Sequence, residues 1–227
     1  MGNVILISGG SDGLGREIAR ILAPDCQVVV FSTKEDKLRT LSEETGCAYQ
    51  VGDVTAWDDV ERICQWTIAT YGRIDCLINN AGVWLEGPLD ENTPAEISRV
   101  MNVNATGTML LTRAALPQLK VQGAGTIINV ISQAGITSQA DRSVYYASKW
   151  AITGFTKCLQ AELGPQNIKV TAVYPGSMLT SFFDKAGNPR DMSKALDPVA
   201  VAKAIVSVVR LEGDATIPEI GIKYVLK

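Results

Sequence analysis

Short apolar runs alternate with longer amphipathic stretches along almost the whole chain. Seven runs have the length and composition of strands, at residues 4–7, 27–31, 48–51, 74–78, 126–131, 169–174 and 217–225. Six stretches repeat apolar residues at helical spacing, at residues 14–22, 35–44, 57–70, 95–121, 144–163 and 198–210. Continuous apolar strands joined through helices indicate a parallel sheet covered on both faces. The pattern therefore predicts a doubly wound, Rossmann-like α/β fold.

Nothing in the sequence divides the chain. It has no linker, internal repeat or charge block, and 227 residues suit one well-buried domain spanning residues 1–227. One irregular stretch, residues 176–195, follows the sixth predicted strand. Ligands of open α/β sheets lie beyond the carboxyl ends of the strands, so this stretch is a candidate substrate lid; an ordinary surface excursion is the alternative.

Composition excludes several classes of function. The net charge of −3 leaves no basic footprint for nucleic acid, and no apolar run reaches the length of a membrane span. The sequence contains no histidine, so we expect no metal centre and no triad built on imidazole. Five widely spaced cysteines without a CxxC pair are typical of a reducing compartment. We therefore expect a cytoplasmic protein whose partners are small molecules.

A glycine-rich loop directly follows the first predicted strand. It runs Ser-Gly-Gly-Ser-Asp-Gly-Leu-Gly over residues 8–15 and leads into a helix. Glycines at this place permit unusual backbone angles and a close approach to a pyrophosphate, and the helix N-terminus offers N–H donors. Asp53 follows the third strand, and residues 79–82, Asn-Asn-Ala-Gly, follow the fourth. Singly these are a helix cap and a turn; together with the loop they indicate a dinucleotide-binding edge.

Tyr145 and Lys149 open the longest helix and are four residues apart, so they share one helical face. A nearby ammonium lowers the pKa of a phenol and makes tyrosine useful for proton transfer. Packing of an aromatic ring under a lysine is the alternative. Ser132 follows the fifth strand and serves as a hydrogen-bond donor, since no base is present to activate it. Asn104 in mid-helix suggests a specific bond, although a solvated helix face is also compatible.

These residues, in this order, resemble the short-chain dehydrogenases/reductases over nearly the whole chain. The resemblance implies strand order 3-2-1-4-5-6-7 and a catalytic tetrad of Asn104, Ser132, Tyr145 and Lys149. It implies that Tyr145 transfers a proton to a carbonyl oxygen bound by Ser132, that Lys149 holds a ribose, and that Asn104 holds a relay water. Ser8 in place of the usual Thr keeps the hydroxyl.

The resemblance also implies a cofactor-binding set along the carboxyl edge of the sheet. Its members are Gly9, Ser11, Asp12, Gly13, Leu14, Gly15, Ser32, Thr33, Lys34, Asp53, Val54, Asn80, Ala81, Gly82, Tyr145, Lys149, Pro175, Gly176 and Thr180. Candidate pocket residues for the substrate are Trp84, Leu85, Gln133, Ile136, Tyr146, Met178 and Phe182. No arginine placed to clamp a carboxylate stands out, so we expect a neutral or weakly polar carbonyl compound.

The leading functional hypothesis is a carbonyl reductase or alcohol dehydrogenase that uses a nicotinamide cofactor. Two alternatives are a dinucleotide-binding regulator or scaffold without turnover, and an epimerase or dehydratase on the same fold. An intact tetrad disfavours the scaffold.

The tip of the second strand bears on the choice of cofactor. Ser32, Thr33 and Lys34 place no carboxylate where NAD enzymes use one to bind the ribose, and Arg16 and Lys37 lie nearby in sequence. Asp12 in the glycine loop and Glu35 argue the other way. NADP(H) is therefore predicted to be preferred, with NAD(H) as the alternative.

The helices at residues 95–121 and 144–163 carry apolar residues on more than one face. We expect them to form a four-helix contact in a homodimer, or in a homotetramer of two such dimers.

Overall fold

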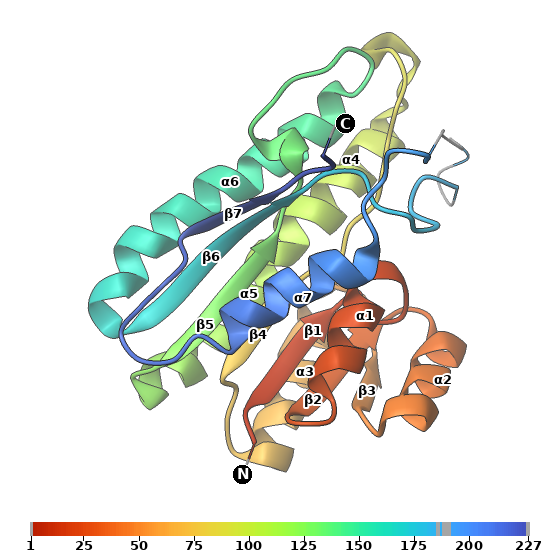
Figure 1. The fold of residues 1–227 in the computed structure, drawn as a ribbon. Coiled ribbons are helices and arrows are strands. Elements are labelled where there is room, and N and C mark those ends of the chain that lie inside the picture. Colours follow the sequence, from red (N-terminus) through yellow and green to blue (C-terminus); the bar gives the residue numbers. More distant parts are fainter. Residues whose placement is uncertain (1, 185–186, 188–191, 226–227) are drawn as a thin grey trace.

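The computed structural model describes residues 2–184, 187 and 192–225, and shows one sheet between two layers of helices (Figure 1). The strands are β1 (Val4–Ser8), β2 (Gln27–Ser32), β3 (Ala48–Val51), β4 (Cys76–Asn79), β5 (Gly125–Val130), β6 (Ile168–Pro175) and β7 (Glu219–Ile222). All six strand pairs are parallel, and the order is β3-β2-β1-β4-β5-β6-β7. The predicted fold class and strand order are therefore confirmed.

Within the described residues, seven α-helices connect the strands. They are α1 (Gly13–Leu22), α2 (Glu35–Thr45), α3 (Trp57–Tyr71), α4 (Pro94–Met101), α5 (Gly107–Gln122), α6 (Ser143–Leu163) and α7 (Pro198–Val209). Local sequence explains several starts: Asp12 caps α1, and Thr93 with Glu96 forms a capping box ahead of Pro94 on α4. None of the helices in the described ranges has the length and apolar content needed to cross a bilayer.

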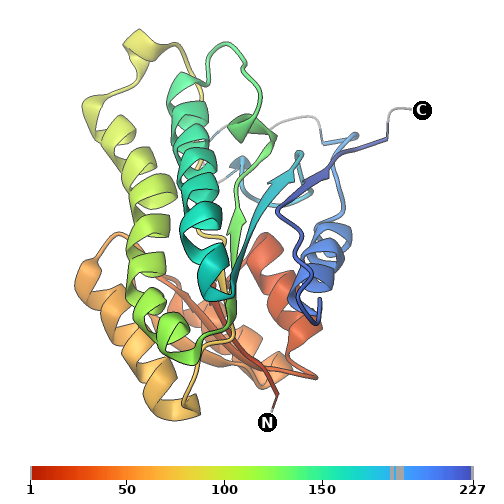
Figure 2. The ribbon, with the colours of Figure 1, turned by 90° about the vertical axis from the view of Figure 1, so that its left-hand side faces the viewer.

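Each face of the sheet has its own hydrophobic core. Leu14 and Ile18 of α1 pack with Leu38 of α2 and Ile205 of α7 on one face. The other core contains residues of α3, α5 and α6, such as Leu111. Figure 2 shows α3, α5 and α6 on one side of the sheet, and α1 and α7 on the other. β1 is buried along its whole length, as the unbroken apolar run predicts for a central parallel strand.

A buried polar bridge crosses the second core. The Asn79 amide donates to Thr112 Oγ1 at 3.0 Å and to Asn129 Oδ1 at 2.8 Å, and Asn129 in turn donates to Thr156 Oγ1 at 2.8 Å. These four side chains are buried and connect β4 and β5 with α5 and α6. Buried polar groups that find partners fix one arrangement of the elements they join. The bridge thus sets α6, which carries Tyr145, against the sheet.

Three predicted elements differ from the structure by more than one residue at a boundary or in kind. The stretch at residues 95–121 is not one α-helix, because a π-helical turn at Asn102–Thr106 separates α4 from α5. The strand predicted at 74–78 is Cys76–Asn79, shifted toward the site. The last strand is shorter than 217–225, since Tyr224 and Val225 are exposed and do not extend the sheet.

Candidate active site

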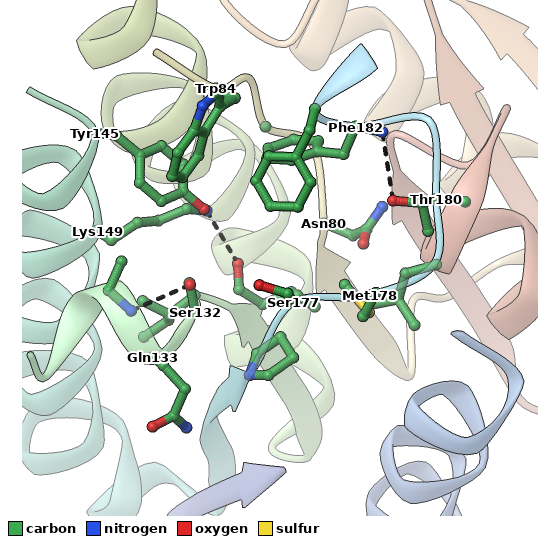
Figure 3. Close-up of a pocket in the computed structure, with 18 of the residues that line it drawn as sticks. Asn80, Trp84, Ser132, Gln133, Tyr145, Lys149, Ser177, Met178, Thr180 and Phe182 are labelled. Atoms are coloured by element: carbon green, nitrogen blue, oxygen red, sulfur yellow. Dashed lines mark hydrogen bonds between the residues drawn. The ribbon is translucent and has the colours of Figure 1, made fainter. Parts of the chain in front are cut away.

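A cavity of about 480 Å³ lies at the carboxyl edge of β1, β4, β5 and β6. Figure 3 shows Tyr145, Lys149 and Trp84 on one side of it, with Ser177, Met178 and Phe182 of the segment after β6 on the other. We call the part around Gly9, Ser11 and Gly13 the glycine end, and the part around Trp84, Tyr145 and Phe182 the aromatic end. One cavity therefore joins the predicted loop and the predicted catalytic residues.

Backbone forms most of the glycine end. Gly9 and Gly13 have φ values of +66° and +51°, a region that favours glycine. A Cβ on Gly15 would lie 2.4 Å from the Gly9 carbonyl oxygen and 2.5 Å from Asn80 Nδ2, so no side chain fits there. The start of α1 faces the cavity at Gly13 and Leu14. A helix N-terminus lined by glycine suits an anion such as a pyrophosphate.

Hydrogen bonds hold the loop after β4 against the glycine loop. Ser8 Oγ accepts from the backbone N–H groups of Asn80 and Ala81 at 3.0 and 3.1 Å. The Asn80 amide donates to the carbonyl oxygens of Ser8 and Gly9, both at 3.1 Å. The Ser8 hydroxyl, which a threonine would also provide, therefore holds the loop after β4 in place. Asn80, Ala81 and Gly82 all line the cavity.

The structure brings Ser132, Tyr145 and Lys149 together at the cavity. Ser132 Oγ accepts from Ala134 N at 3.1 Å, and the Ser132 hydroxyl is near enough to the Tyr145 phenol to lower its pKa. Lys149 Nζ lies 5.7 Å from the centre of the Tyr145 ring and donates to the Val130 carbonyl at 3.5 Å. Serine and phenol hydroxyls side by side can bind the same carbonyl oxygen. The helical spacing of Tyr145 and Lys149 predicted this proximity.

Burial dominates the pKa values of the pair. It raises the pKa of Tyr145 above its ordinary value, and the hydrogen bond with Ser132 offsets only part of that rise. Burial also lowers the pKa of Lys149 to about 8. The expectation that the Lys149 ammonium lowers the pKa of Tyr145 is wrong for this structure, because burial raises that pKa and Lys149 is not among the groups that shift it. The protonated phenol, which is the form that can give a proton, is stabilised.

Asn104 is completely buried, which excludes a solvated helix face. It lies in the π-helical turn, where its Oδ1 accepts from Val83 N at 2.8 Å. Its amide donates to the Val83 carbonyl and to Ser148 Oγ, both at 3.0 Å. The specific bond suggested by its mid-helix position is present. These contacts brace the loop after β4 against α6; the relay water stays a prediction.

The described part of the candidate lid, residues 176–195, contributes one side of the cavity; that it acts as a lid stays a prediction. Gly176, Ser177, Met178, Thr180, Phe182 and Phe183 line the cavity, and Thr180 Cγ2 would lie 3.3 Å from a Cβ on Gly13. A bridge between Met178 and Leu196 anchors both ends of the segment. Residues 185–186 and 188–191 of the predicted lid lie outside the described residues.

Aromatic side chains close the other end of the cavity. The ring centres of Trp84 and Tyr145 are 4.3 Å apart, and that of Phe183 lies 5.0 Å from Trp84 in an edge-to-face contact. Of the predicted substrate residues, Trp84, Gln133, Tyr146, Met178 and Phe182 line the cavity. Leu85 does not, because it packs with Val100 and Val144, and Ile136 points to solvent.

Sequence reasoning missed an arginine. Arg142 lines the cavity together with Gln139, Ser177 and Ser181. Its position three residues before Tyr145, at the start of α6, is the one signal that could have found it.

The residues predicted to bind the adenosine half lie beyond the cavity. Ser32, at the end of β2, accepts from Lys34 N at 3.0 Å, while Thr33 and Lys34 are exposed. Asp53 accepts from the backbone and side chain of Thr55 at 2.8 Å; it is not the helix cap of the alternative interpretation, because the N-cap of α3 is Ala56. Asp12 caps α1 and pairs with Lys37, and Arg16 pairs with Glu44 at 2.6 Å. Two of the cations expected near the second strand are therefore engaged by carboxylates.

Comparison with known proteins places the chain in a family. The family model described as short chain dehydrogenase matches residues 3–191, and the chain belongs to this family. Trans-4-hydroxycyclohexanecarboxylate dehydrogenase of Sinomonas cyclohexanicum is 36% identical over 189 residues, covering 78% of this chain and 73% of that protein. A 3-alpha-(or 20-beta)-hydroxysteroid dehydrogenase of Mycobacterium bovis is 32% identical, covering 91% and 82%.

A solved structure agrees over nearly the whole chain. The alcohol dehydrogenase of Thermococcus sibiricus, complexed with 5-hydroxy-NADP, has a TM-score of 0.89 at 26% identity and covers 99% of this chain and 97% of its own. The protein is thus an NAD(P)-dependent oxidoreductase that binds a nicotinamide dinucleotide and a small-molecule substrate.

Proposed function

We propose that the protein is an NADP(H)-dependent carbonyl reductase or alcohol dehydrogenase acting on a small ketone or the matching secondary alcohol. The observation that carries this proposal is the single cavity that joins the glycine end to Ser132, Tyr145 and Lys149. The nicotinamide ring supplies or accepts a hydride at the carbon of the substrate. Every other step falls to side chains of this chain.

Tyr145 is the proton donor of the reduction in this proposal. As the carbonyl carbon gains a hydride, its oxygen gains the proton of the Tyr145 hydroxyl, and an alcohol results. Ser132 hydrogen-bonds the same oxygen and holds it beside the phenol. The raised pKa of Tyr145 keeps it protonated before the transfer. Lys149 and Thr180 hold the cofactor, and Asn104 keeps α6 in place through Ser148.

The pyrophosphate is assigned to the glycine end. Gly9, Gly13 and the start of α1 leave backbone facing the cavity, while Gly15 has no room for a side chain. Asp53 and Val54 would meet the adenine, with the ribose near Ser32 and Thr33. The assignments of the adenine and its ribose rest on the positions of these residues at the ends of β2 and β3, because none of the four residues lines the cavity.

NADP(H) is the proposed preference over NAD(H). The absence of a carboxylate at the end of β2 and the exposed Lys34 beside it support this, as does the NADP analogue in the Thermococcus sibiricus enzyme. Asp12 does not oppose a phosphate with its full charge, because Lys37 neutralises it. Lys34 is therefore the cation that we assign to the 2′-phosphate.

The proposed assembly is a homodimer through α5 and α6, or a tetramer of two dimers. Met109 on α5 and Trp150 on α6 are exposed apolar side chains, 36% and 52% accessible. Light scattering at micromolar concentration tests this, and a monomeric mass contradicts it. We also propose that the chain forms a single domain. We propose that the protein is located in the cytoplasm, because a reducing compartment would keep its five cysteines as free thiols.

The first experiment follows NADPH absorbance in the presence of a panel of ketones. Oxidation of NADPH that depends on the ketone supports the reductase. Binding of NADPH without turnover of any ketone would favour the scaffold, and conversion of a substrate without net change in NADPH would favour an epimerase or dehydratase.

A further inference from the structure

A second cation besides Lys149 lines the cavity, at its aromatic end. The side chain of Arg142 is 17% exposed, lines the cavity, and holds its guanidinium carbon 5.6 Å from the centre of the Trp84 ring. Trp84 in turn packs on Tyr145, the proposed proton donor. An arginine so placed would be the natural anchor for a carboxylate on the substrate.

Side chains of the protein already bind the Arg142 guanidinium. Nε and Nη2 each lie 2.9 Å from Glu86 Oε1, and Nη1 donates to Gln139 Oε1. The Tyr146 hydroxyl donates to the same Gln139 oxygen at 3.3 Å. A backbone bond of 2.7 Å from Gly87 N to the Asp141 carbonyl joins the two loops that carry Glu86 and Arg142. All three guanidinium nitrogens therefore have an acceptor within the protein.

We propose that the ion pair of Arg142 with Glu86 determines specificity, and that it selects uncharged substrates over carboxylates. The inference rests on the proposed function. The Glu86 carboxylate balances the charge of Arg142 and, with Gln139, takes three of its five N–H groups, so a substrate carboxylate would meet a guanidinium whose charge is already paired. A neutral ring can pack on aromatic side chains such as Trp84 and Phe182 without an ionic partner.

The partial burial of Arg142 and Glu86 strengthens the electrostatic effect of each of the two charges. Glu86 is 25% exposed and Arg142 less, so water screens the two charges only in part. Loss of the carboxylate would leave a positive charge in the pocket wall. Because the guanidinium also contacts Trp84, that charge would stay beside the substrate and attract an anion.

The test compares two probes that differ by one carboxylate, cyclohexanone and 4-oxocyclohexanecarboxylate. Glu86→Gln keeps an acceptor for Arg142 and removes the charge. We expect the ratio of kcat/KM for the acid to that for cyclohexanone to rise about tenfold, which is about 1.4 kcal/mol. The double variant Glu86→Gln with Arg142→Gln should return the ratio to the wild-type value. Gln139→Ala, which frees Nη1 without changing charge, should raise the ratio less.

Asp25→Asn is the matched control, because it removes one negative charge from an exposed pair with Arg210 (2.7 Å), and neither residue lines the cavity. An unchanged ratio in Glu86→Gln, or an equal rise in Asp25→Asn, would overturn the inference.

A binding measurement separates this inference from the proposed function. Calorimetry compares cyclohexanecarboxylate with cyclohexanecarboxamide on the full chain and needs no turnover. If neither ketone is reduced, the proposed function fails, while a shift of about tenfold toward the carboxylate in Glu86→Gln still supports the role of the pair. An unshifted ratio of affinities contradicts that role even if the ketones are reduced.

Discussion

The glycine end and the aromatic end of the cavity are built from different parts of the amino acid. At the glycine end the wall is backbone, and a Cβ on Gly15 would collide with the Gly9 carbonyl. At the aromatic end the wall consists of side chains, with Phe183 and Arg142 each against the Trp84 ring. A backbone wall tolerates no added atoms, whereas a side-chain wall can be rebuilt. Substitutions should therefore abolish binding at one end and change selectivity at the other.

Lys149, between the two ends, should affect both turnover and stability. Lys149→Met is expected to lower turnover by about 10³-fold, because it removes the group assigned to the cofactor beside Tyr145. It should also raise the free energy of unfolding at pH 7 by about 2 kcal/mol, since Lys149 is an almost completely buried cation. Steady-state kinetics and urea unfolding measure the two effects.

The pH dependence of stability provides the control for Lys149. Burial lowers its pKa from 10.5 to about 8, so the unfolded chain binds this proton more tightly than the folded protein. The contribution of Lys149 to stability therefore rises with pH above about 8. Burial raises the pKa values of thiols such as Cys64 and Cys76, which lowers stability at high pH in both proteins alike. The stability of the wild type relative to Lys149→Met should therefore rise between pH 7 and 9.5. A variant less stable than the wild type at pH 7 would contradict the account.

Gly15→Ala tests the backbone wall. Alanine normally favours a helix over glycine by about 1 kcal/mol, but here its Cβ would lie 2.4 Å from the Gly9 oxygen. We expect a loss of about 1 to 3 kcal/mol in stability, together with weaker NADPH binding. Gly164→Ala is the control, because that glycine has helical backbone angles and open space around it. Equal behaviour of the two variants would show that the loop is not tight.

Lys34→Glu tests the proposed cofactor preference. A carboxylate beside the end of β2 should repel a 2′-phosphate and accept a bond from a 2′-hydroxyl, so the ratio of NADPH to NADH affinity should fall about tenfold. Lys120→Glu, at the far end of α5, makes the same change of charge away from the loop. Fluorescence titration at fixed ionic strength measures both. An unchanged ratio removes Lys34 from the cofactor site.

Phe182→Leu should have the smallest effect. The ring centre of Phe182 lies 6.4 Å from those of Trp84 and Tyr145, so it covers the aromatic end without touching the glycine end. We expect KM for a ring ketone to rise about threefold while NADPH affinity stays unchanged. Phe155→Leu, in the core on the α6 side of the sheet, controls for stability. A larger effect on NADPH than on the ketone would contradict the division into two ends.

What the sequence could predict follows the same division. The glycine loop, and Tyr145 with Lys149, are sets of residues close together in the chain, so their spacing alone places them. Arg142 and Glu86 meet across 56 residues, and Phe183 reaches Trp84 from a different segment. No local pattern encodes those contacts, which is why the charge in the pocket wall escaped prediction.

The π-helical turn and the pKa values were hidden for other reasons. The apolar spacing of residues 95–121 predicts one continuous helix, because a single π-helical turn hardly changes that spacing. The polar Asn104 in mid-helix was the feature that pointed to an irregularity. Helical spacing predicted that Tyr145 and Lys149 are close, but it carries no information on burial. Burial sets both pKa values.

The most direct test of the proposed function is Tyr145→Phe, measured as ketone-dependent NADPH oxidation alongside NADPH binding. Phenylalanine keeps the ring that packs on Trp84 at 4.3 Å and removes only the hydroxyl. The account predicts a loss of turnover of about 10² to 10⁴-fold with nearly unchanged NADPH affinity. A turnover close to that of the wild type would contradict the assignment of Tyr145 as the proton donor.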